Sequence, residues 1–165
     1  MKLDPGDRIE HVHESYTVGD VNNDKVIDTA IAVFDRIIKA DSSIWNDCGK
    51  GICELKIEFR KPVAPIIFEA MNVYIEPTLD VNSDGANEIL VYKWRYECCW
   101  VTLDLYTYKG NTWKILSTTK AFITWDENDF KNRVIRKNNN YYLIGQKWNK
   151  DYSIIIEDKI RIKTK

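Results

Sequence analysis

The chain has 165 residues, of which 44% are apolar, enough to bury one substantial core and typical of a single domain, 1–165. Its 24 basic and 25 acidic residues leave a net charge of -1, which gives no electrostatic footprint for nucleic acid or an anionic membrane. No apolar run approaches the roughly 18 residues of a membrane span, and the first seven residues lack the apolar core of a signal peptide.

The residue types favour strands. Nine Tyr, six Trp and five Phe occur with many Val, Ile and Thr residues, a mixture enriched in β-sheets. The composition therefore predicts an all-β fold.

The first third of the chain contains apolar segments separated by polar turns. Residues 15–18 are predicted as a short strand. Residues 29–34 fit a short strand buried on both faces, and the start of a helix running through Ile37 and Ile38 fits them as well. Residues 41–51 collect Asp, Ser, Asn and Gly, which predicts a loop.

The middle of the chain has the clearest strand patterns. Residues 54–60 alternate apolar and charged side chains, as a half-buried strand does, and 66–75 is an apolar stretch for one or two strands. Residues 89–96 form the best predicted strand. Residues 100–108, a turn at 109–111 and a returning strand at 113–116 then complete an antiparallel meander.

The last third repeats short strands and turns. Asp126 is expected to start a helical turn within 126–133. Further strands are predicted at 121–125, 134–136, 141–146 and 153–157, with alternation continuing through 162. Roughly ten short strands with frequent turns indicate a sandwich or propeller-like blades.

Two acidic turns carry oxygen-bearing side chains at alternate positions, and each leads into an apolar segment. Positions one, three, five and nine are Asp20, Asn22, Asp24 and Asp28 in the first loop, and Asp80, Asn82, Asp84 and Glu88 in the second. Position seven, where a backbone carbonyl can bind a metal, is Val26 in the first loop and Ala86 in the second. The loops start 60 residues apart, near 20 and 80, so the sequence predicts two copies of a loop-then-strand unit.

Such turns suit a hard cation. Calcium takes six to eight oxygens, at about 2.3–2.6 Å, from carboxylates, amides and backbone carbonyls. Gly85 permits a sharp turn at position six of the second loop, whereas Lys25 stands there in the first, so the second loop is the stronger candidate. Asp, Asn and Gly also form turns without any metal, and this alternative stays open for both loops.

The position of the last carboxylate distinguishes between loop families. An EF-hand loop needs it at position twelve, where these loops have Ile31 and Val91. A ninth-position carboxylate that leads directly into a strand resembles the calcium loops of FG-GAP/VCBS-type repeats, known from the β-propellers of integrin α chains and from bacterial surface proteins. The resemblance covers about 30 of the 165 residues.

That resemblance implies that the side chains at positions one, three, five and nine of both loops, with the carbonyls of Val26 and Ala86, bind Ca²⁺. The Phe-Gly and Gly-Ala-Pro signatures of the repeats are absent, and 165 residues at 60 per blade cannot close a propeller of the usual size. A partial, blade-like assembly or a sandwich is therefore expected.

His11 and His13 offer a rival site. On a strand, both would face the same side, with Glu10 and Glu14 beside them, as in a hydrolytic metal centre. No third ligand stands at a suitable spacing, so exposed histidines near a terminus are the competing interpretation.

The four cysteines allow one local disulfide. Cys48 and Cys53 flank a turn-like segment that could bring them together, whereas Cys98 and Cys99 are adjacent in a strand-like run and are expected as buried thiols. The aromatic residues Trp94, Tyr96, Trp100 and Trp113 either fill a core or form a surface for sugars or a protein.

These features predict a calcium-stabilised, non-enzymatic β domain that binds protein or glycan. The resemblance implies a bacterial protein that is extracytoplasmic once a leader absent from this chain has been removed. Two alternatives remain: a small metal-dependent hydrolase that uses His11 and His13, and an interaction domain whose two loops are plain turns.

Overall fold

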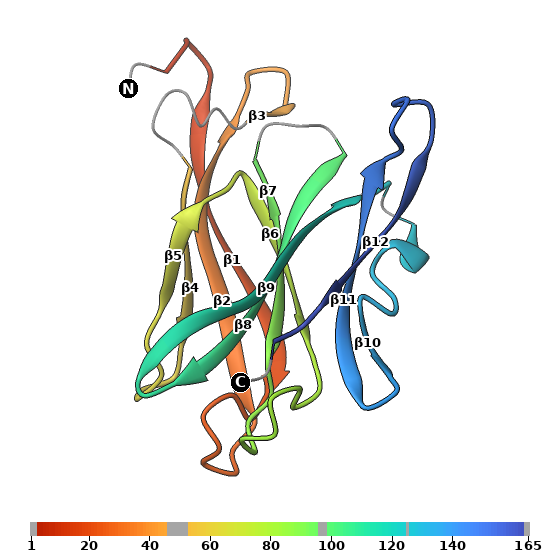
Figure 1. Cartoon of the computed structure of the whole chain (residues 1–165). Coiled ribbons are helices and arrows are strands. Elements are labelled where there is room, and N and C mark those ends of the chain that lie inside the picture. The colour runs from red at the N-terminus through yellow and green to blue at the C-terminus, as the bar shows by residue number, and fades with distance from the viewer. Residues whose placement is uncertain (1–2, 46–52, 96–98, 125, 164–165) are drawn as a thin grey trace.

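The fold is an all-β sandwich in three antiparallel sheets (Figure 1). The computed structural model describes residues 3–45, 53–95, 99–124 and 126–163. Within these ranges there is no α-helix, and no helix long and apolar enough to cross a membrane.

Each sheet is formed by strands from one part of the chain. The first sheet has the order β1-β2-β4-β5, with β3 paired to β2, and contains β1 (Arg8–Gly19), β2 (Asp28–Ile38), β3 (Ile44–Trp45), β4 (Glu54–Phe59) and β5 (Ile66–Glu69). The central sheet contains β6 (Asn72–Pro77), β7 (Ile89–Trp94), β8 (Trp100–Lys109) and β9 (Thr112–Phe122), in that order. The third sheet contains β10 (Val134–Lys137), β11 (Asn140–Trp148) and β12 (Ile155–Arg161).

The central sheet is covered on both faces, which makes two apolar cores. On one face, Ile89 and Val91 of β7 belong to the core shared with the first sheet. On the other face, Leu90 and Tyr92 belong to the core that includes Leu143 of the third sheet. All six residues of β7 are therefore buried, including Lys93.

A charged pair lies buried in the central sheet. The Lys93 ammonium group contacts the Asp104 carboxylate, and the two residues are 5% and 2% exposed. The Thr118 hydroxyl donates to the other Asp104 oxygen at 2.6 Å, and the Lys93 ammonium lies 5.0 Å from the centre of the Phe68 ring. The pair is thus stabilised by a hydrogen bond and by an aromatic face.

Several strand predictions are confirmed. β4 alternates as expected, with Leu55 and Ile57 buried, and the stretch 66–75 divides into β5 and β6. Asp126 caps the 3-10 helix η2 (Glu127–Asp129), its side chain accepting from the Asn128 backbone N–H.

Three strand predictions are wrong in extent. β1 begins at Arg8, well before residue 15, because its partner β2 pairs with it along the whole hairpin. β2 continues through Ile38 as a strand and excludes the helix, and its outward residues Ile31 and Val33 are only half-buried, not fully covered. The predicted strands at 113–116 and 121–125 are one strand up to Phe122, with a register shift that leaves Leu116 unpaired.

Candidate metal centre

The two acidic loops are hairpin loops that lie side by side at one end of the sandwich (Figure 1). The first joins β1 to β2 in the first sheet, and the second joins β6 to β7 in the central sheet. They contact each other directly, because the Asn87 N–H donates to the Asp20 carbonyl at 2.7 Å and the Asn23 amide donates to the Asp84 carbonyl at 3.2 Å. A site in one loop is therefore supported by the other.

Both loops have the same hydrogen bonds at equivalent positions. The position-one carboxylates, Asp20 and Asp80, each accept the N–H groups of positions five and six. The position-nine carboxylates, Asp28 and Glu88, each accept the N–H of position two, at 3.0 and 2.7 Å. These bonds turn the acidic side chains toward the inside of each loop.

Positions four and six of each loop need left-handed backbone. Asn23 and Ser83 have φ values of 61° and 63°, and Lys25 and Gly85 have 70° and 90°. A Cβ atom at Gly85 would lie 2.7 Å from the Asn23 amide nitrogen of the other loop. Glycine adopts this backbone without strain and leaves room for the contact with Asn23, whereas Lys25 adopts it in the first loop at a cost.

The second loop gathers three carboxylates. Oxygen atoms of Asp80, Asp84 and Glu88 all lie within 4.8 Å of one another. Oxygens bound about 2.4 Å from one calcium ion are at most about 4.8 Å apart, so the three groups fit a shared ion. Among the described residues this is the one group of three metal-ligating side chains that meets such a distance.

Glu88 is the member of this group that the fold buries completely. Its side chain has 0% exposure, and its oxygens accept from the Val81 N–H and the Asn82 amide, both at 2.7 Å. Burial, together with the charges of Asp84 and Asp80, raises the pKa of Glu88 to about 7. A neighbouring positive charge would therefore stabilise the ionised form of Glu88.

The remaining predicted ligands of the second loop lie around this group. The Asn82 amide nitrogen donates to Glu88 and, at 2.9 Å, to the hydroxyl of Thr107 on β8. Its oxygen accepts the Asp84 N–H at 2.9 Å, which leaves a second lone pair of that oxygen for a cation. Ala86 is buried, and its N–H donates to the Asp84 carboxylate at 3.1 Å.

The first loop has the same backbone but does not gather its acids as closely. Asp20, Asp24 and Asp28 do not form a group within the distance met by the second loop. Asp28 is one methylene shorter than Glu88, although it is also buried, and burial raises its pKa. Asn22 donates to Asp24 at 3.0 Å, and Val26 is 48% exposed.

The predicted histidine site is on the outer face of the first sheet. His11 and His13 both point outward from β1, and His11 Nδ1 lies 2.6 Å from Asp35, with 73% of the His11 side chain exposed. No group of three potential ligands that includes either histidine occurs in the described ranges.

Only two of the four cysteines, Cys53 and Cys99, lie within the described residues. Cys53 is disulfide-bonded. Cys48 and Cys98 lie outside the described residues, as does Tyr96. Cys99, expected to be buried, is half-exposed.

The tryptophans divide between core and surface. Trp94 is buried in the core between the central and third sheets. Trp113 packs against the other core and donates its indole N–H to the Ala64 carbonyl at 2.7 Å. Trp100 is half-exposed and lies 6.0 Å, between ring centres, from Trp148. Trp148 was not among the sequence-based candidates, because a lone Trp beside a turn carries no periodic signal.

Two further residues at the candidate metal centre have no signal in the sequence. Thr107 approaches from β8, and Asn87 binds the first loop through its backbone and its side chain, which accepts the Asp20 N–H at 3.2 Å. Position eight of the first loop is Ile27, so the repeat offers no hint of Asn87's role.

Comparison with known proteins adds no family. No family model, curated protein or solved structure matches the chain.

Proposed function

We propose that the chain is a non-enzymatic binding domain whose second acidic loop holds a structural Ca²⁺ ion. The observation that carries the proposal is the convergence of Asp80, Asp84 and the fully buried Glu88 within 4.8 Å. Three carboxylates this close repel one another when ionised, and a divalent cation removes that repulsion. The resemblance of the loop to FG-GAP/VCBS-type calcium loops supports the same ion.

The position of the loops supports a structural role for the ion. The second loop connects β6 to β7, the fully buried strand, and its neighbour connects the first hairpin. An ion bound only by the folded loop stabilises the folded protein by mass action, by about 2.7 kcal/mol at a hundredfold excess over Kd. It would thereby hold together the ends of two sheets.

The disulfide at Cys53 supports an extracytoplasmic location, since disulfides persist mainly in oxidising compartments. The proposed domain is bacterial and exported, and its partner is a protein or a glycan. The hydrolase alternative gains no support from the outward-facing histidines.

Thermal unfolding in EDTA and in millimolar CaCl₂ tests the proposal. We expect calcium to raise the midpoint by roughly 5–10 °C, since a domain of this size gains about 2–4 °C for each kcal/mol. Magnesium at the same concentration is the control, because its strict octahedral geometry suits this loop less well. Equal midpoints with EDTA and calcium would refute the structural ion.

A further inference from the structure

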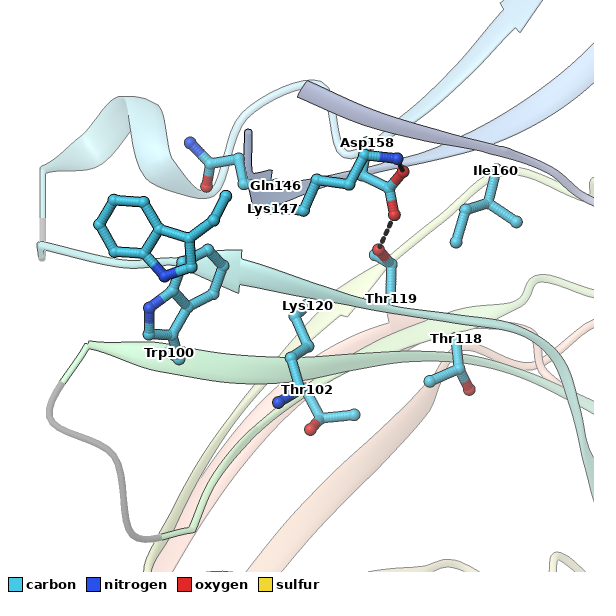
Figure 2. Close-up of a pocket in the computed structure, with 10 residues that line it drawn as sticks. Trp100, Thr102, Thr118, Thr119, Lys120, Gln146, Lys147, Asp158 and Ile160 are labelled. Carbon is cyan, nitrogen blue, oxygen red and sulfur yellow. Dashed lines mark hydrogen bonds and ion pairs between the residues drawn. The ribbon is translucent and has the colours of Figure 1, made fainter. Parts of the chain in front are cut away.

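A cleft between the central and third sheets lies apart from the candidate metal centre (Figure 2). Its walls come from β8 and β9 on one side and from β11 and β12 on the other. Its volume is about 600 Å³, within the range of roughly 300–1,000 Å³ found for small-molecule sites.

One end of the cleft is aromatic. The rings of Trp100 and Trp148 lie 6.0 Å apart at an angle of 54°, and Phe122 supports Trp100 at 5.5 Å. Trp148 is 42% exposed at the end of β11. Two accessible indole faces at one mouth favour a ligand with flat apolar faces.

The rest of the lining is polar apart from Ile160. Figure 2 shows Lys147 and Thr119 meeting the carboxylate of Asp158, with distances of 2.5 and 3.5 Å. Thr102, Thr118 and Lys120 extend the polar wall along β8 and β9. Two lysines and one aspartate give the lining a net charge of one positive unit.

The backbone holds this lining in place. A Cβ atom on Gly145 of β11 would come within 2.5 Å of the Lys120 carbonyl oxygen, so only glycine lets β11 approach β9 this closely. The next residue, Gln146, accepts the Phe122 N–H at 2.9 Å and contacts the Arg133 guanidinium at 3.5 Å. A preorganised lining loses little entropy when a ligand binds.

We propose that this cleft binds a glycan chain. A sugar ring has apolar C–H faces that stack on indoles and hydroxyl groups that bond to paired donors and acceptors, and the cleft offers both. Protein interfaces are usually depleted of lysine and aspartate at their centre, whereas two lysines and an aspartate line this cleft. The proposal rests on the binding role proposed above and specifies the site and ligand class.

The site is tested by native electrophoresis in gels that contain one soluble polysaccharide each, both neutral (β-glucan, xylan, mannan) and acidic (polygalacturonate, alginate). We expect retardation in at least one gel. Retardation by acidic polymers alone would indicate that the lysines bind a uronic-acid carboxylate. Retardation by neutral polymers would indicate that the site recognises sugars by stacking and by hydrogen bonds to hydroxyl groups.

Variants separate the cleft from other surfaces. Trp148→Ala and Asp158→Ala should each weaken binding about tenfold or more. Tyr152→Ala should leave it unchanged, because Tyr152 is 78% exposed on the neighbouring turn but does not line the cleft. Trp148→Phe should retain part of the binding. That result would show that the binding lost in Trp148→Ala does not come from misfolding.

Absence of retardation by every polysaccharide, undiminished binding by Trp148→Ala, or binding of a peptide library and no glycan would overturn the proposal. Each protein is also melted with and without calcium. Calcium stabilisation without glycan binding defeats only the cleft, and glycan binding without calcium stabilisation defeats only the metal site.

Discussion

Replacing Glu88 with Gln should stabilise the calcium-free protein at pH 8 and abolish its response to calcium. The folded environment raises the pKa of Glu88 from 4.5 to about 7. Between these pH values the folded protein keeps a proton that the unfolded chain has released. The free energy of unfolding therefore falls as the pH rises through this window, and the loss is complete above pH about 7.

The size of the effect follows from the same shift. At pH 8 the ionised carboxylate costs the calcium-free fold about 3 kcal/mol. Gln removes this cost and keeps an acceptor for the Val81 N–H, but its NH₂ meets the Asn82 amide nitrogen, which costs about 1 kcal/mol. The net gain is about 2 kcal/mol at pH 8, and at pH 5 the two proteins should agree within about 1 kcal/mol.

Urea unfolding followed by tryptophan fluorescence, at pH 5 and 8 and with EDTA or calcium, measures both effects. The matched control is Asp28→Asn, which alters the equivalent carboxylate of the first loop and should leave the calcium response intact. If Glu88→Gln retained the calcium stabilisation of the natural protein, or if it gave no advantage at pH 8 in EDTA, the assignment of Glu88 would be wrong.

Two other predictions concern the fold that carries the site. Gly85→Ala should lower the free energy of unfolding by about 1–3 kcal/mol, because φ is 90° and the new Cβ meets the neighbouring loop. Gly110→Ala should lower it less, because φ is 62° and the space around it is open. Urea midpoints of the two variants measure the difference. Lys93→Met leaves the buried Asp104 without its ion-pair partner and should lower the free energy of unfolding by about 3–5 kcal/mol, measured by thermal unfolding. Lys56→Met removes a surface pair and should lower it by less than about 1 kcal/mol. Similar losses from the two lysine substitutions would contradict the buried pair's importance.

Local pattern was enough for the fold class and for most strands of the middle of the chain. Residues 54–60 alternate because only one face of β4 meets a core. Residues 89–94 carry apolar side chains on both faces, with Lys93 as the exception, because β7 has a core on each side. The length of β1 could not be predicted, since its outward face is polar and it extends through pairing with β2.

The candidate site was predictable to the extent that its ligands are close in sequence. Spacing alone placed Asp80, Asp84 and Glu88 in one loop. The approach of Thr107 depends on how β8 pairs with β7, which the loop sequence does not encode. The cleft is harder still, because Trp100 and Trp148 come together only where the third sheet crosses β9.

Titration calorimetry of calcium into the metal-free protein at pH 8 tests the central claim most directly. We expect calcium to bind at the second loop, and we expect Glu88→Gln to abolish this binding and Asp28→Asn to preserve it. Absence of calcium binding by the natural protein, or binding lost with Asp28→Asn and kept with Glu88→Gln, would contradict it.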